Sequence, residues 1–420
     1  MFPDVSPFIV NSPGMKFMNY IKRWFSSLAR VFAREWHLVL HDQGVLIFFI
    51  LLPLMYPVAY TLIYNPEVVT DMPIAVIDHD RTAASRKLVR DASAAPTIAI
   101  YDYVPDMAAA RDLMARGEVF GILEIPSDFG KKIGRMEPTH ATFYAQTSLL
   151  LRYRGFMGAI ADVQIKDISE ITASRAATLG ATGSALSGVP IGNEAHMLGD
   201  VEQGFASFVM PGIVVLILQQ SMVLGICMLG GTSRERRRRN GGIDPLNIPG
   251  APVSAVVWGR TLCYTVCYIV PALYLLHFIP VMFGLPHFGN PVDYLLFIFP
   301  MLLASAFFGQ TLNYFVTDRE STFIVIAFTS VIFLFLSGLT WPQYAMSGLW
   351  KGLGDAIPGV WGVAGFIRIN SNDGTLFENM TPWLWMWGLT IFYFITSMIV
   401  FRVVARRETR LSRGTVTSQS

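Results

Sequence analysis

The residues of this chain that could do chemistry do not complete any catalytic pattern. Gly130-Lys131-Lys132 comes nearest to the phosphate-binding loop G-x-x-x-x-G-K-[ST], but it lacks the upstream glycine and the hydroxyl residue. Without them, backbone N–H groups cannot form the phosphate cradle of that loop. Neither H-E-x-x-H nor G-x-S-x-G occurs anywhere in the sequence. We therefore predict no catalytic residues and no ATP hydrolysis by this chain itself.

Two pairs of side chains have the spacing of metal or redox ligands. His37 and His41 share one face of a predicted helix, with Asp42 beside them. A metal site needs more ligands and a shielded cavity, which favours polar residues at an interface instead. Cys263 and Cys267 lie in an apolar run, where small residues at a helix contact are the favoured reading. We predict no metal site and no cofactor bound by this chain.

The polar residues inside the apolar runs are uncharged. No Asp, Glu, Lys or Arg lies within the interior of these runs, whereas ion-coupled carriers commonly bury such charges. The polar positions that could line a path are Gln219, Gln220, Gln310 and Asn313. Hydrogen bonds between helices explain most of them equally well. The energy for transport would then come from a cytoplasmic motor, although a non-transporting membrane scaffold would show the same pattern.

Six apolar runs are long enough to predict membrane-spanning helices. About 20 apolar residues in a helix cross the roughly 30 Å of bilayer hydrocarbon. Only 15% of the 420 residues are charged, against about 25% in soluble proteins. The runs are Val45–Ile63, Phe208–Gly230, Leu262–Phe283, Tyr294–Val316, Thr322–Leu339 and Trp383–Val403. The fold class predicted is a membrane α-helical bundle of six transmembrane helices.

Basic residues gather in alternate connections between these runs. They precede the first run, form Arg234–Arg239 after the second, include Arg319 after the fourth, and recur after the sixth, whereas Gly284–Asp293 has none. Cytoplasmic loops carry the excess of Lys and Arg, so both termini are predicted to be cytoplasmic. The net charge of +2 is too small to indicate nucleic-acid binding.

The chain divides into stretches of different character. Residues 1–14 are predicted to be disordered, 15–42 to form an amphipathic interfacial helix, and 43–64 to form the first transmembrane helix. Residues 65–205 alternate predicted strands and helices, which indicates an inserted extracytoplasmic α/β domain. Within them, Leu179–Gly192 reads as flexible. Residues 206–403 contain the other five spans, with a loop at 231–260, and 404–420 form a basic cytoplasmic tail.

The segment 15–42 repeats apolar residues at steps of three and four, with basic residues between them. The apolar set is Met18, Ile21, Phe25, Leu28, Phe32 and Trp36. This pattern is typical of a helix on a membrane surface, and also of a soluble helix packed on protein. Its position just before a span favours the membrane interface.

The connection after the second run carries a family resemblance. It begins with Arg234, Glu235 and Arg236, continues through Gly241, Ile243 and Asp244, and ends with Pro252-Val253-Ser254 and Gly259-Arg260. We read it as a basic turn followed by a short amphipathic piece. In order and spacing it resembles the first cytoplasmic loop of the ABC-2 type permeases, a family of ATP-binding-cassette exporters. The resemblance extends over most of the chain, from about residue 20 to 405, and is nearest to bacterial permeases with a large outer domain.

The resemblance implies a mechanism in which this loop forms a coupling helix that docks on an ATPase subunit. The residues carried over to that role are Arg234, Glu235, Arg236, Asp244, Pro252, Val253, Ser254 and Arg260. Gly242, Pro245 and Pro249 depart from the family pattern, because proline breaks a helix interior. The docking element is therefore expected to be shorter or displaced.

The same resemblance implies partners and a location. ATP and Mg would bind to a separate ATP-binding-cassette ATPase subunit, and a second permease would complete a homodimer or heterodimer. The location would be the bacterial inner membrane, with a periplasmic adaptor as a further candidate partner. Two other classes remain open: a scaffold or assembly factor whose outer domain binds a periplasmic partner, and a membrane enzyme, for which clustered catalytic residues are missing.

Overall fold

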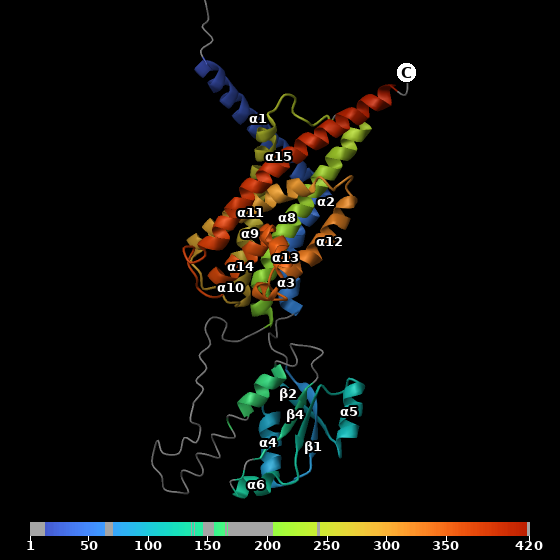
Figure 1. Cartoon of the computed structure of the whole chain (residues 1–420), viewed down its shortest axis with the longest axis vertical. Helices are drawn as coiled ribbons and strands as arrows, with labels where there is room; N and C mark the ends of the chain where they lie inside the picture. Colours follow the sequence, from blue (N-terminus) through green and yellow to red (C-terminus); the bar gives the residue numbers. More distant parts are fainter. Residues whose placement is uncertain are drawn as a thin grey trace, which may run out of the picture. The chain divides into compact units, whose positions relative to one another are not determined.

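The computed structural model describes residues 13–63, 70–135, 137, 139–145, 155–163, 166, 205–241 and 244–417. The chain forms two compact units (Figure 1). One comprises Met1–Asn65, Leu198–Val201 and Ala206–Ser420, and the other comprises Pro66–Met197 and Glu202–Phe205. Most of the predicted disordered start and all of Leu179–Gly192 lie outside the described residues. Pro13 and Gly14 already belong to the first helix, which begins earlier than predicted.

In the helical unit, five described helices are long and apolar enough to cross a membrane. They are Gln43–Ile63, Phe205–Arg239, Val253–Phe283, Pro291–Leu312 and Met380–Val404. The fifth predicted span, Thr322–Leu339, corresponds to α12 (Ser321–Leu336), which has only 16 residues. At 1.5 Å per residue it is about 24 Å long, which is short of the roughly 30 Å of hydrocarbon.

Helix α8 (Phe205–Arg239) corrects the predicted loop 231–260. The run Arg234–Arg239, predicted as a turn, forms the last turns of this helix, because arginine is a good helix former and has no reason to end one. The helix is followed by Gly241, whose φ of 62° is a left-handed conformation typical of a helix end. Helix α9 (Val253–Leu273) then begins nine residues before the predicted start of the third span. Only residues 240–252 connect the two helices, and the described ones among them form turns.

Two spans contain a short π-helical segment near prolines. The first span consists of α2 (Gln43–Leu46), η1 (Ile47–Leu51) and α3 (Leu52–Ile63). The third continues from α9 through η3 (Tyr274–Phe278) into α10 (Ile279–Phe283). Helix α1 (Pro13–His41) precedes the first span, and Asp42 caps α2 by accepting a hydrogen bond from Val45 N–H.

The remaining helices include a pair that the sequence did not predict. Helix α11 (Pro291–Leu312) is the fourth span, and α15 (Met380–Thr417) extends from the last span through most of the predicted tail. Between α12 and α15, the one-turn η4 (Gln343–Ala345) is followed by α13 (Gly348–Asp355) and α14 (Pro358–Asn370). Helix α14 has 13 residues, most of them buried, so it enters the bundle without crossing it.

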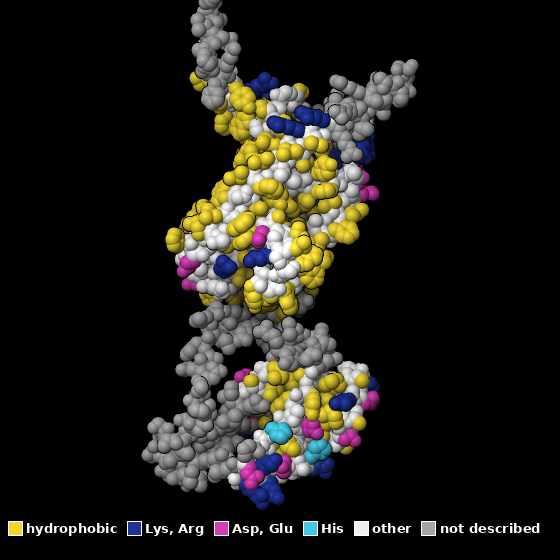
Figure 2. Space-filling view, in the orientation of Figure 1, with side chains coloured by type: hydrophobic (Ala, Val, Ile, Leu, Met, Phe, Trp, Pro, Cys, Tyr) yellow, Lys and Arg dark blue, Asp and Glu magenta, His cyan; other side chains and the backbone are white. Residues whose placement is uncertain are grey.

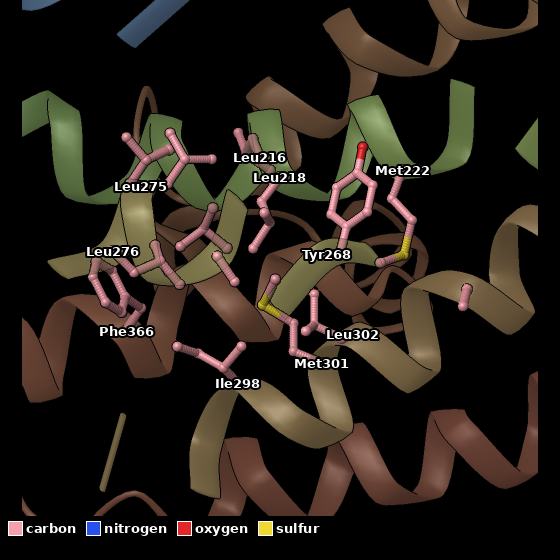
Figure 3. Close-up of a cluster of buried hydrophobic side chains, with 14 of the residues drawn as sticks. Leu216, Leu218, Met222, Tyr268, Leu275, Leu276, Ile298, Met301, Leu302 and Phe366 are labelled. Atoms are coloured by element: carbon pink, nitrogen blue, oxygen red, sulfur yellow. The ribbon is translucent and has the colours of Figure 1, made fainter. Parts of the chain in front are cut away.

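Helix α8 supplies the largest share of the buried residues in the helical unit. Its side chains form one apolar cluster with residues of α9, η3, α11 and α14. Figure 3 shows part of this cluster, with Leu216, Leu218 and Met222 from α8 facing Tyr268, Leu275 and Met301. The second span is therefore the central element of the bundle.

The α/β unit contains a four-stranded sheet in the order β2-β1-β3-β4. The strands are β1 (Met72–Asp78), β2 (Ile98–Tyr103), β3 (Gly121–Ile125) and β4 (Thr142–Ala145). Strand β1 pairs in parallel with β2 and β3, and β4 is antiparallel to β3. Helices α4 (Ala83–Ser93), α5 (Met107–Ala115) and α6 (Phe129–Arg135) alternate with the strands. Strands and helices therefore alternate in this unit, as the sequence predicts for residues 65–205, and residues 155–163 are helical as well.

Candidate functional site

Glu35 joins α1 to the third span. Its side chain is 2% exposed, and its carboxylate accepts hydrogen bonds from Arg260 Nε at 3.0 Å and from the Tyr264 hydroxyl at 2.9 Å. The neighbouring Arg34 also pairs with it. Burial opposes ionisation of this carboxyl, but the charges of Arg260 and Arg34 outweigh that effect and hold the pKa of Glu35 below its ordinary value. Glu35 is therefore a buried, charged link between two helices.

A glycine lets these two helices approach closely. A Cβ added at Gly259 of α9 would lie 2.9 Å from the Leu28 carbonyl oxygen and 2.9 Å from Val31 Cβ of α1. Any larger residue at 259 would push the helices apart. Because Arg260 follows directly in sequence, the same contact brings its guanidinium to Glu35.

The connection between α8 and α9 lies against α1. Arg23 donates to the Gly250 carbonyl at 2.9 Å, and Arg34 donates to the Leu246 carbonyl at 2.9 Å. At the start of α9, where Pro252 is the N-cap residue and Val253 the first helical residue, Trp24 Nε1–H donates to Ser254 Oγ at 3.0 Å. Helix α1 therefore holds the predicted docking segment along its length.

Asp244 attaches the same connection to the end of α8. Its carboxylate accepts hydrogen bonds from Ser233 Oγ at 2.6 Å and Leu246 N–H at 3.1 Å, and pairs with Arg236 Nε at 3.4 Å. Burial would raise the pKa of Asp244, but these donors outweigh it and lower the pKa below the ordinary value. The carboxylate thus stays ionised and closes the loop on the helix.

Glu235 and Arg319 connect the end of α8 to the loop between α11 and α12. Glu235 Oε1 accepts a hydrogen bond from the backbone N–H of Arg319 at 2.8 Å. The Arg319 guanidinium donates to both carboxylate oxygens of Asp42, at 3.1 and 2.5 Å. Arg234 donates to the Asn313 carbonyl at the end of α11. We call these ion pairs and charged hydrogen bonds, which centre on Glu35, Asp244 and Arg319, the ionic network. They lie at the end of the helical unit where α8 and α11 end and where α2, α9 and α12 begin, and Lys and Arg side chains are visible at this end in Figure 2.

The predicted path-lining residues fall into two groups. Gln310 Nε2 donates to Thr261 Oγ1 at 2.6 Å, and Asn313 Nδ2 donates to the Ile226 carbonyl at 3.4 Å, so both join helices. Both also line small cavities at the arginine-rich end, together with Gly230, Ser233 and Arg260. Gln219 and Gln220 differ, because neither amide has a hydrogen-bond partner within the described residues.

The other ligand-type pairs form no larger cluster. The His37 and His41 rings lie 3.8 Å apart, and His41 Nδ1 is 2.9 Å from the His37 carbonyl. Cys263 is buried and Cys267 half-buried, and both are free thiols. Among the described residues, no group of three or more His, Cys, Asp and Glu side chains could hold a metal ion.

Three residues of the ionic network, Glu35, Asp42 and Arg319, are not among the site residues that the sequence predicts. Glu35 is the only acid between residues 15 and 41, within a helix otherwise rich in Lys and Arg, and that isolation was the available signal. Arg319 was used only to orient the loops, and Asp42 was noted only beside the histidine pair. Their pairing joins segments 277 residues apart and could not be found from local spacing.

The long apolar helices and the ionic network at one end define a multi-pass helical membrane protein. Residues 44–399 match the model of a protein family described as ABC-2 family transporter protein. The match covers most of the chain, which therefore belongs to the ABC-2 transporter family, as a membrane component of a transporter. A comparison with curated proteins found no match.

Proposed function

We propose that this chain is the permease subunit of an exporter that moves its substrate out across a bacterial inner membrane. The observation that carries the proposal is the ionic network around Glu35, Arg260 and Arg319, which ties α1 and the loops of one end to four of the spans. Because these contacts join several helices, a displacement of one loop by a bound ATPase would move several spans together. Membership of the ABC-2 family supports the same reading.

In this proposal, ATP and Mg bind to a separate ATPase subunit. The charged residues predicted to meet that subunit mostly have partners within the chain: Glu235 with Arg319, Asp244 with Ser233 and Arg236, and Arg260 with Glu35. Their role would be to fix the docking segment to the spans. The docking surface itself would be the exposed turns at residues 245–247 and 249–250, where Leu246 is 42% exposed.

The arrangement in the membrane follows from the basic residues. The arginine-rich end would be cytoplasmic and the α/β unit periplasmic, because its connections carry no excess of Lys and Arg. Two copies of this chain, or one copy with a similar permease, would enclose the path. The α/β unit would be available to a periplasmic adaptor.

The test is co-purification and ATP turnover with the candidate ATPase. The wild-type chain should co-purify with an ATPase subunit and raise its turnover. Leu246→Glu should reduce both severalfold, because it places a charge in the docking surface. The control is Tyr103→Glu in the α/β unit, because Tyr103 is 60% exposed there. Failure of the wild-type chain to bind or stimulate any ATPase would overturn the proposal.

A further inference from the structure

Helix α14 lies with its backbone directly against two spans. Gly359, Gly362 and Gly365 are spaced three apart, so they share one face of the helix. A Cβ added at Gly359 would lie 1.7 Å from Gln219 Oε1 of α8, and one at Gly365 would lie 2.1 Å from Phe297 Cζ of α11. The glycine face therefore meets α8 and α11 without room for any side chain.

The Gln219 side chain meets this face as a buried polar group. It is 1% exposed, and neither its amide nitrogen nor its amide oxygen has a hydrogen-bond partner within the described residues. The amide of the adjacent Gln220 has none either. An amide offers both donor and acceptor groups, and burying it unpaired destabilises the state in which it is buried.

In contrast to the two glutamine amides, Ser221 and the residues at the ends of α14 are paired. Ser221, two residues from Gln219, accepts a hydrogen bond from the Tyr268 hydroxyl at 2.9 Å, and that hydroxyl points toward α8 in Figure 3. The ends of α14 are also fixed: Asn370 Nδ2 donates to the Pro286 carbonyl at 2.7 Å, and the Tyr393 hydroxyl donates to the Ala356 carbonyl at 2.6 Å. The unpaired Gln219 amide therefore faces α14 between groups that are paired, Ser221 on α8 and the residues at both ends of α14.

We propose that the contact between α8 and α14 is a closed gate in the transport path, and that Gln219 binds the substrate when the gate opens. This inference rests on the proposed export function. In the open state the amide could form hydrogen bonds that it lacks in the closed state. The unpaired amide therefore lowers the stability of the closed state relative to the open state. The ligand class is a molecule with neutral hydrogen-bonding groups, because an uncharged amide is the polar group presented there.

The first test compares two single variants, at positions two residues apart on α8. Each is measured in the complex of this chain with the ATPase. Gln219→Leu removes an unpaired amide, so the midpoint of thermal unfolding should rise by a few degrees while ATP turnover falls severalfold. Ser221→Ala removes a paired hydroxyl, so the midpoint should fall and turnover per folded complex should stay near wild type. A lower midpoint for Gln219→Leu, or a higher one with unchanged turnover, would overturn the gate.

The second test is a reversible cross-link in a background without Cys227, Cys263 and Cys267. Gln219→Cys combined with Gly359→Cys places two thiols across the contact, and shortening Gln219 removes the atom that a Cβ at 359 would meet. The matched control is Thr311→Cys with Thr396→Cys, whose hydroxyls lie 2.9 Å apart between α11 and α15. Oxidation should stop ATP turnover in the first pair only, and a reductant should restore it.

Trapping the ATPase with vanadate then separates the gate from the export function. The yield of the 219–359 cross-link should fall severalfold in the trapped complex, while the control yield stays constant. Equal yields, together with ATPase stimulation by the wild-type chain, would overturn the gate alone. Absence of any ATPase stimulation by the unmodified complex would overturn the export function and the gate with it.

Discussion

Glu35 on α1 accepts a hydrogen bond from Arg260 on α9 at 3.0 Å, across 225 residues of sequence. The carboxylate is buried, and the two groups lie beside the close contact at Gly259. A buried charge is costly unless it is paired, so each residue depends on the other. This pair adds a buried ionic link to the close packing of α1 against α9.

The first prediction concerns loss of that pair. Glu35→Gln leaves Arg260 buried without its counter-charge, and removal of one partner of a buried ion pair typically destabilises by about 3–5 kcal/mol. We expect a lower midpoint of thermal unfolding in detergent, and reduced ATPase stimulation because α1 no longer moves with α9.

The control for this variant replaces both partners by apolar residues. Glu35→Leu with Arg260→Met leaves no unpaired charge, and such replacements are often neutral or stabilising. The double variant should therefore recover most of the lost stability. If Glu35→Gln and the double variant unfold at the same temperature, the pair does not act as a unit.

The second prediction is the pH dependence of stability. The pKa of Glu35 is lowered in the folded protein below its ordinary value of 4.5, so its contribution is fully present above 4.5. The contribution is lost as pH falls from 4.5 through the lower folded value, because the unfolded state binds the proton first. Asp244 adds in the same direction below 3.8. Unfolding midpoints measured from pH 7 to pH 3 should fall less steeply for Glu35→Leu with Arg260→Met than for wild type.

Much of this architecture follows from local sequence signals. The strands and helices of the α/β unit lie where alternation and turn residues predict them, since strand β1 is buried on both faces and Thr82 and Asp106 cap the helices that follow. The apolar runs likewise locate five long helices, because hydrophobicity over about 20 residues is a strong signal.

Other features depend on contacts that no local pattern contains. Helix α14 is short and rich in glycine, so its composition reads as a loop, and only packing against α8 and α11 makes it helical. The apolar run places the end of α8 near Gly230, but the helix continues through Arg234–Arg239 and is followed by Gly241 in a left-handed conformation. The ionic network was missed because its partners, such as Asp42 and Arg319, come from distant segments.

The third prediction concerns Glu235, one of the residues that the family resemblance assigns to coupling with the ATPase. The carboxylate accepts a hydrogen bond from the Arg319 backbone N–H, and a glutamine oxygen can accept the same bond. Hydrogen bonds to charged groups are worth about 1.5–3 kcal/mol and neutral ones about 0.5–1.5 kcal/mol. We therefore expect a small loss of ATPase stimulation for Glu235→Gln and a larger loss for Glu235→Ala, measured at equal membrane levels. Equal activity for wild type and both variants would remove Glu235 from the coupling residues.

The fourth prediction concerns the orientation of the chain. The basic connections predict that Asn240, at the end of α8, is cytoplasmic and that Ala94, in the α/β unit, is outside. Both residues are exposed, so a cysteine at either position can react with a thiol reagent. In cells expressing a variant without Cys227, Cys263 and Cys267, a membrane-impermeant maleimide should label Ala94→Cys once the outer membrane is made permeable. Asn240→Cys should be labelled only after the inner membrane is opened as well. The opposite pattern would reverse the orientation and place the ionic network outside, where no ATPase could reach it.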